Sequence, residues 1–237
     1  MEKEHYRGKT LTMRVYVYCE GQTEESFIKR VLSPYLQQFQ ITTIPIICKT
    51  GSSDHKKQKG GVSSYSKIKK ELIQLCGEHK NEIVTTMFDY YGFPKETLGS
   101  KIKGADLYNH VKSIELAIKD DIQHENCIIN LVVHEYEALL FSNPDSFSSL
   151  YPHAVSELSK IRNNYMNPEF INDSQATAPS KRISSIISDY SKVRAGVIIA
   201  ESIGIEKILS ECPHFKEWVD TIIRRTSESE IHLDSTL

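Results

Sequence analysis

The sequence of 237 residues lacks several motifs that would define its chemistry directly. It has no GxxxxGK[ST] loop, no GxGxxG turn after a strand and no GxSxG elbow, which argues against an autonomous P-loop nucleotidase, a Rossmann dinucleotide enzyme and an α/β-hydrolase esterase. In His134-Glu135-Tyr136-Glu137, Ala138 stands where the HExxH zinc motif needs a second histidine. No cysteine pair has CxxC spacing, so a zinc site is not indicated.

Long apolar runs are also missing. No run approaches the roughly 20 residues that a membrane helix needs. The first twelve residues are polar and charged, without the apolar core of a signal peptide, and we expect the domain to start near Met13. The five cysteines are widely separated, and Cys19, Cys48 and Cys127 fall in predicted strands. These features predict a cytoplasmic protein without a membrane partner.

Charge is nearly balanced, with 29 basic and 31 acidic residues and a formal net charge of -2. A basic surface covering the whole protein is therefore excluded, and nucleic acid would have to bind a local patch. Two segments could bind phosphates: one contains Lys57 and Lys59, and the other places Lys181 and Arg182 at a helix start. Solvated surface lysines are the commoner explanation for the first segment, whereas the Pro-Ser cap would position the cations of the second.

Strands alternate with helices in the first part of the chain. Short apolar runs predict strands over 15–19, 41–48, 83–88 and 127–133, with helices over 65–80 and 105–123. This alternation predicts an α/β fold with a parallel sheet. From residue 143 only helical segments are expected, over 152–164, 180–190, 195–203 and 214–225. We predict an α/β domain over 13–142 and a helical extension over 143–226 packed on it.

The first predicted strand ends at Glu20, beside the turn residue Gly21. Thr23 is a candidate N-cap for the next helix, and Glu24 and Glu25 suit the positive end of that helix. In parallel α/β folds ligands bind beyond the carboxyl ends of the strands, where Glu20 would lie. The alternative is an ordinary helix-capping turn with surface acids.

Two further strands end in candidate ligands, at Asp89 and at His134 with Glu135. The carboxyl ends of parallel strands share one edge, so these residues would converge with Glu20. Clustered carboxylates repel each other unless a cation lies between them, and oxygen ligands favour Mg²⁺ or Mn²⁺. On a helix, Glu137 could point into the same crevice as His134. Alternatively, one or more of these acids simply caps a helix.

Several segments, in this order, resemble a known bacterial family. They are Glu20-Gly21-Gln22-Thr23-Glu24-Glu25, Asp89-Tyr90-Tyr91-Gly92, His134-Glu135-Tyr136-Glu137-Ala138-Leu139-Leu140-Phe141, Ala178-Pro179-Ser180-Lys181-Arg182 and Cys212-Pro213-His214-Phe215 with Trp218. Glu20-Gly21 after the first strand and Asp89 after the third resemble the pattern of a Toprim-type fold. The whole set of segments resembles the family called domain of unknown function 4276. The resemblance covers the chain from about Met13 to Trp218.

The resemblance implies a Toprim-like sheet and Mg²⁺-dependent phosphodiester chemistry. It gives Glu20 the acid/base role and makes Asp89 the first aspartate of an Asp-x-Asp metal pair. Tyr91 stands in place of the second aspartate. Either Glu24, Glu135 or Glu137 supplies the lost oxygen, or the site has lost catalysis. The resemblance also implies an ATPase partner of the ABC or SMC type and a setting of phage defence.

The leading hypothesis is a metal-dependent nuclease acting on DNA or RNA. Its rivals are a non-catalytic Toprim-like partner of an ATPase and a small-molecule phosphohydrolase. Whether the protein forms a homo-oligomer is open. The expected catalytic residues are Glu20, Asp89, Glu24, His134 and Lys181, the metal ligands are Glu20, Asp89, Glu135 and Glu137, and the substrate-binding residues are Lys181, Arg182, Lys57 and Lys59.

Overall fold

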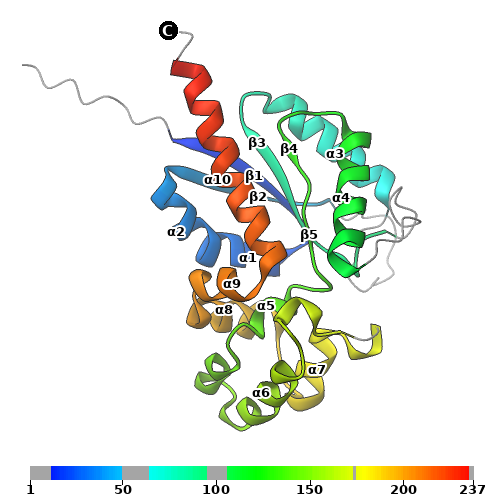
Figure 1. The fold of residues 1–237 in the computed structure, drawn as a ribbon, viewed down its shortest axis with the longest axis vertical. Coiled ribbons are helices and arrows are strands. Elements are labelled where there is room, and N and C mark those ends of the chain that lie inside the picture. The colour runs from blue at the N-terminus through cyan, green and yellow to red at the C-terminus, as the bar shows by residue number, and fades with distance from the viewer. Residues whose placement is uncertain (1–11, 50–63, 95–105, 173–174, 235–237) are drawn as a thin grey trace, which may run out of the picture.

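A parallel β-sheet forms the centre of the protein. The computed structural model describes residues 12–49, 64–94, 106–172 and 175–234 (Figure 1). Its strands run in the order β2-β1-β3-β4, and β5 also pairs with β3. Every pairing is parallel. The bounds are β1 Met13–Cys19, β2 Ile41–Ile47, β3 Ile83–Asp89, β4 Cys127–Ile128 and β5 Leu131–Val132.

The strand predicted over 127–133 is interrupted in the structure. Thr86 Oγ1 accepts a hydrogen bond from Asn130 N and donates one to Asn130 O, both at 2.8 Å. The Thr86 side chain thus replaces the main-chain ladder at this point and separates β4 from β5. The apolar run over 127–133 does not show that a threonine hydroxyl replaces the main-chain hydrogen bonds of Asn130. The sequence therefore did not predict the break between β4 and β5.

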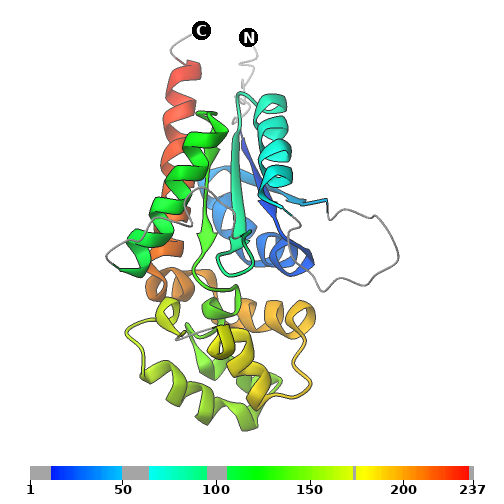
Figure 2. The same cartoon turned by 90° about the vertical axis from the view of Figure 1, so that its right-hand side faces the viewer.

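Helices cover both faces of the sheet (Figures 1 and 2). Tyr16 and Tyr18 of β1 face helices α3 (Tyr65–Glu78) and α4 (Leu107–Ile122). Val15 and Val17 face the opposite layer, which contains α1 (Gln22–Phe27), α2 (Ser33–Leu36) and α10 (Pro213–Asp234). Burial of both faces explains why the strands read as continuous apolar runs.

One helical segment follows β1, and its middle part, Ile28–Leu32, is a π-helix that ends just before Pro34. Proline lacks the N–H that an α-helix needs, and the structure accommodates this by widening the preceding turn. Pro45 is tolerated in β2 because this strand lies at the edge of the sheet.

The second half is helical and packs beyond the carboxyl ends of the strands (Figure 1). Helix α9 was not predicted, and α10 continues to Asp234, past the expected end near residue 225. The remaining α-helices are α5 Glu137–Leu140, α6 Val155–Asn163, α7 Pro179–Ile186, α8 Val197–Ile203 and α9 Ile205–Glu211. Short 3₁₀ helices lie at Gln37–Phe39, Pro144–Ser149, Pro152–Ala154, Pro168–Phe170 and Gln175–Thr177, and a π-helical turn at Lys192–Gly196.

The fold class is as predicted in its architecture: a parallel α/β sheet with flanking helices and a C-terminal helical extension. Helix α10 runs back from the extension along the sheet, where Trp218 Nε1 donates to Thr85 Oγ1 of β3 at 2.8 Å. The domain boundary near residue 142 stays a prediction. In the part of the chain that the structure describes, no helix is long and apolar enough to cross a membrane.

Candidate metal and catalytic site

The turn after β1 places two glutamates differently. Gly21 is the N-cap of α1, and the Glu24 carboxylate accepts a hydrogen bond from Gly21 N at 2.9 Å. The expected Thr23 cap is therefore wrong, because Thr23 lies buried inside the first turn. Glu24 is only 4% exposed, whereas Glu25 pairs with Lys29 at 2.6 Å on the outside. Of these two neighbouring acids, Glu24 faces the interior.

Asp89 ends β3 and lies beside Glu20. Its Oδ1 atom accepts a hydrogen bond from Tyr136 N at 2.7 Å, which fixes the carboxylate at the carboxyl edge of the sheet. A Cβ atom at Gly92 would lie 3.2 Å from Glu20 Oε2 and 3.7 Å from Asp89 Cβ. The glycine therefore leaves room for the Glu20 carboxylate over the turn that follows Asp89.

Lys192 lies at the centre of the acidic cluster. Its Nζ atom is 3.1 Å from Asp89 Oδ2, 3.4 Å from Glu137 Oε2 and 3.7 Å from Glu24 Oε1. The lysine begins the π-helical turn before α8, far along the chain from the acids. We define Glu20, Glu24, Asp89, Glu137 and Lys192 as the carboxylate cluster. Sequence reasoning missed Lys192, because an isolated lysine between two predicted helices carries no distinctive signal.

Burial and the excess of carboxylates shift the pKa values of the cluster. Burial, reinforced by Asp89 and Glu24, raises the pKa of Glu20 to about 7. Burial also raises the pKa of Glu137 to about 7, although Lys192 opposes the shift. Burial alone would lower the pKa of Lys192, but Asp89, Glu137 and Glu24 raise it above its ordinary value. The lysine is therefore charged, and two of the carboxyls titrate near neutral pH.

His134 lies apart from the carboxylate cluster. Its backbone has the left-handed φ of 63°, and its ring lies 5.1 Å from the ring of Tyr91. Its Nδ1 atom is 3.3 Å from Asn172 Nδ2, and Asn172 also donates to the Tyr91 hydroxyl. Burial lowers the pKa of His134 to about 4, so the ring is neutral at pH 7. Tyr91, which stands where the resemblance led us to expect a second aspartate, thus packs with His134 and Asn172.

Glu135 also points elsewhere. Its carboxylate accepts a hydrogen bond from Ser180 N at 3.0 Å, at the start of α7. On the same helix, Arg182 donates to Thr177 O at 2.8 Å and to Tyr165 Oη at 2.6 Å, while Lys181 is exposed. The structure therefore groups Glu20, Glu24, Asp89 and Glu137 and places Glu135, His134, Lys181 and Arg182 outside that group; Lys57 and Lys59 lie outside the described residues.

The cluster surrounds the ammonium of Lys192 with carboxylates. Among the described residues, no three His, Cys, Asp or Glu side chains are arranged ready to hold a metal ion. The donors are nonetheless hard carboxylate oxygens, which suit Mg²⁺ or Mn²⁺. Glu137 Oε2 is buried without a hydrogen-bond partner among them, and its contact is the ion pair with Lys192. A cation could be held by Glu20, Glu24, Asp89 and Glu137 once the ammonium moves.

The fold and the cluster define a parallel α/β protein with an acidic site at the carboxyl edge of its sheet. The chain belongs to the family described as "Domain of unknown function (DUF4276)", whose model matches residues 19–223. This confirms the family resemblance seen in the sequence. A comparison with curated proteins gives no match.

Two similar solved structures are of the C-terminal region of the Xanthomonas campestris pv. campestris OLD protein. The structure phased with iodine is 16% identical, with a TM-score of 0.44, over 93% of this chain and 98% of that chain. The structure phased with platinum is 14% identical, with a TM-score of 0.45, over 95% of this chain and 98% of that chain.

Proposed function

We propose that this protein is a Mg²⁺- or Mn²⁺-dependent nuclease that hydrolyses phosphodiester bonds in DNA or RNA. The observation that carries the proposal is the carboxylate cluster at the carboxyl edge of the sheet, where parallel α/β folds bind their ligands. Three of its acids, Glu24, Asp89 and Glu137, are at most 7% exposed. Buried acids in such excess favour binding of a cation.

Glu20, Glu24, Asp89 and Glu137 would hold the ion, which supplies polarisation of the phosphodiester and activation of water. Glu20 is the best general base in the cluster, because a pKa of about 7 lets it accept a proton at neutral pH and release it again. Glu137 has a similar pKa but is 1% exposed, whereas Glu20 is only partly buried. Asp89 is oriented by Tyr136 N and acts as a fixed ligand. Glu137 replaces Glu135 as the assisting ligand.

Lys192, and not Lys181, would be the catalytic lysine that contacts the scissile phosphate. Its side chain is 36% exposed as a whole, so the ammonium would reach a bound phosphate by moving out from between the acids. A lysine placed there neutralises the negative charge that develops on the phosphate oxygens. Lys181, exposed on α7, would contact a more distant phosphate of the substrate. Arg182 would support that helix through Tyr165 and Thr177.

A cleavage assay tests the proposal. Plasmid DNA, single-stranded DNA and total tRNA are incubated with the wild type and with Glu24→Gln, in Mn²⁺ and in Mg²⁺. Glu25→Gln is the matched control, because Glu25 is the next residue along α1 but pairs outward with Lys29. We expect cleavage by the wild type and by Glu25→Gln, and at least a 100-fold loss in Glu24→Gln. Equal cleavage by all three proteins would refute the assignment of the cluster.

A second candidate function is a non-catalytic partner of an ABC- or SMC-type ATPase in phage defence. Two observations favour it: Tyr91 replaces the second Toprim aspartate, and the Lys192 ammonium already offsets part of the negative charge. On this alternative the cluster is an internal ion network that needs no metal. Cleavage that requires both the metal and an intact cluster supports the nuclease, whereas a folded wild type that binds the ATPase but no Mn²⁺ supports the alternative.

A further inference from the structure

The hydroxyl of Tyr190 is buried close to the carboxylate cluster. Its Oη atom has no hydrogen-bond partner among the described residues. A Cβ atom at Gly196 would lie 3.0 Å from Tyr190 Oη and 3.4 Å from Tyr136 Cε1. The hydroxyl therefore lies against the π-helical turn Lys192–Gly196 and near the ring of Tyr136. A buried hydroxyl without a partner is costly, so this one calls for an explanation.

The charges around this hydroxyl belong to the carboxylate cluster. Burial raises the pKa of Tyr190 above its ordinary value, and after burial the carboxylate of Glu137 contributes most to that rise. The ammonium of Lys192 acts in the opposite direction. The phenol therefore keeps its proton at neutral pH, and it is a hydrogen-bond donor in the surroundings of Glu137.

Glu137 is the matching acceptor. It is 1% exposed, and its Oε2 atom has no hydrogen-bond partner among the described residues. This atom forms an ion pair with Lys192 Nζ at 3.4 Å. A buried anionic oxygen needs either a positive charge or a hydrogen-bond donor beside it. If the ammonium leaves, Glu137 therefore needs a donor.

The ammonium of Lys192 and a divalent cation compete for the same carboxylates. Nζ lies 3.1–3.7 Å from oxygen atoms of Asp89, Glu137 and Glu24. Because two positive charges at one place repel each other, the ammonium must move outward when the cluster holds an ion. The Lys192 side chain is 36% exposed, which leaves room for that movement. Glu137 would then face the ion without the lysine.

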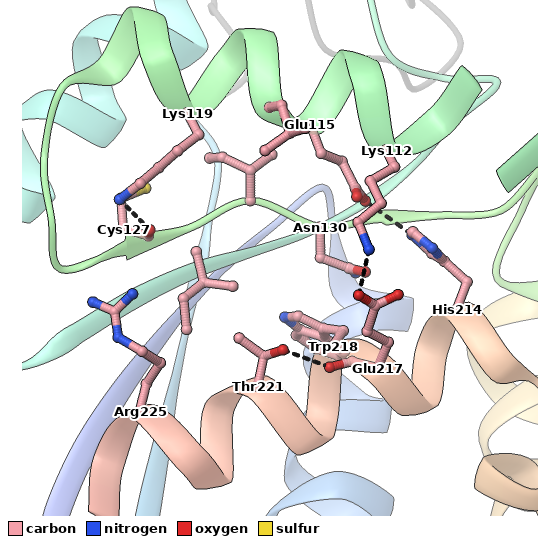
Figure 3. A pocket seen from close by; sticks show the side chains of 13 residues that line it. Lys112, Glu115, Lys119, Cys127, Asn130, His214, Glu217, Trp218, Thr221 and Arg225 are labelled. Carbon is pink, nitrogen blue, oxygen red and sulfur yellow. Dashed lines mark hydrogen bonds and ion pairs between the residues drawn. The ribbon is translucent and has the colours of Figure 1, made fainter. Parts of the chain in front are cut away.

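The other buried groups that could donate and have no partner lie elsewhere. In the described part of the chain they are Thr43 Oγ1, Asn130 Nδ2 and His134 Nε2. Thr43 belongs to the edge strand β2, and His134 packs outside the cluster. Asn130 lines the cavity between α4 and α10 (Figure 3), which shares no lining residue with the carboxylate cluster. Of these groups, only Tyr190 is placed to serve Glu137.

We propose that Tyr190 is a positioning residue of the metal site, whose hydroxyl donates a hydrogen bond to Glu137 once a divalent cation has replaced the Lys192 ammonium. This bond holds the Glu137 carboxylate toward the ion, as the hydrogen-bond partners of metal ligands commonly do. In the metal-free protein Tyr190 has no such role, because Glu137 is paired with Lys192. The inference rests on the proposed function, since it requires an ion in the carboxylate cluster.

Tyr190→Phe tests the metal-free and the metal-bound states separately. Removal of a hydroxyl without a partner should leave the urea midpoint of the metal-free protein unchanged or slightly higher. Tyr136→Phe, which loses the hydrogen bond to Gly196 O, should lower that midpoint. In calorimetry, Tyr190→Phe should bind Mn²⁺ about tenfold more weakly, as is typical when a metal ligand loses its partner. Tyr35→Phe, on α2, is the control and should bind Mn²⁺ as the wild type does.

A double variant locates the effect at Glu137. In a Glu137→Met background the acceptor is absent, so Tyr190→Phe should cause no further loss of Mn²⁺ affinity. An equal loss in both backgrounds would show a merely structural role and overturn the proposal.

Two further outcomes distinguish this inference from the proposed function. Equal Mn²⁺ binding by the wild type and Tyr190→Phe, or a lower urea midpoint of metal-free Tyr190→Phe, would overturn the positioning role and leave the metal site standing. A folded wild type that binds no Mn²⁺ would refute the metal site itself and this inference with it.

Discussion

Lys192 Nζ lies 3.1 Å from Asp89 Oδ2, although 103 positions separate the two residues in the chain. Asp89 ends a strand of the sheet, and Lys192 begins a turn of the helical extension. This ion pair therefore joins the two halves of the chain at the proposed catalytic centre. Its removal should affect both stability and chemistry.

We predict that Lys192→Met lowers the free energy of unfolding by about 1–3 kcal/mol at pH 8. Breaking a fully buried ion pair costs about 3–5 kcal/mol, and the partial exposure of Lys192 reduces that figure. The loss should shrink at pH 5, where Glu20 and Glu137 are protonated. Urea unfolding at the two pH values measures it. Lys207→Met, which breaks an exposed ion pair with Glu211, is the control and should lower the free energy of unfolding by less than about 0.5 kcal/mol. Equal decreases in the two variants would contradict a special role for Lys192.

The metal-free protein should lose stability from the cluster as the pH rises. The pKa of Glu137 is 4.5 ordinarily and about 7 in the folded state. The folded state therefore keeps a proton that the unfolded state releases, and this contribution is complete below pH 4.5 and lost as the pH rises through 7. Glu137→Gln mimics the protonated form, so it should match the wild type at pH 5 and exceed its stability by about 1–2 kcal/mol at pH 8. A wild type that is the more stable of the two at pH 8 would show that this sign is wrong.

Two threonines provide a matched test of the break between β4 and β5. Thr86→Val should cost about 2–3 kcal/mol, because it leaves the N–H and the carbonyl of Asn130 unpaired in the interior. Thr43→Val should be neutral or slightly stabilising, since the buried Thr43 hydroxyl has no hydrogen-bond partner among the described residues. Thermal or urea unfolding of both variants measures the difference, and equal effects would contradict the bridging role of Thr86.

Glu169 fixes the start of α10. Its carboxylate accepts hydrogen bonds from His214 N at 3.0 Å, Phe215 N at 2.9 Å and Tyr108 Oη at 2.7 Å, and the residue is 1% exposed. A buried carboxylate at a helix N-terminus is stabilised by the helix dipole. Glu169→Ala should therefore lower the free energy of unfolding by about 2–4 kcal/mol. Glu157→Ala, on the exposed side of α6, is the control and should change it by less than about 0.5 kcal/mol.

The sheet could be predicted because its strands are short apolar runs that end in polar residues. Glu20 and Asp89 follow such runs, and a parallel sheet necessarily brings its strand ends to one edge. Glu137 was among the expected ligands, and the structure places it in the cluster. These predictions depended on local pattern and on topology alone.

The other features of the candidate site depend on tertiary contacts, which a local sequence pattern does not predict. Lys192 reaches the cluster because the helical extension folds back over the strand ends. Glu135 was an expected ligand, but it accepts from Ser180 N at the start of α7. His134 was expected to be catalytic, but it packs against Tyr91. Local spacing places these side chains near one edge of the sheet, and packing decides which of them face one another.

The most direct measurement is the equilibrium binding of Mn²⁺ to the metal-free protein by calorimetry, comparing the wild type with Asp89→Asn and Glu135→Gln. We expect the wild type and Glu135→Gln to bind Mn²⁺ with similar affinity, and Asp89→Asn to bind it at least tenfold more weakly. Absence of Mn²⁺ binding by the folded wild type, or equal binding by Asp89→Asn, would contradict a metal site in the carboxylate cluster.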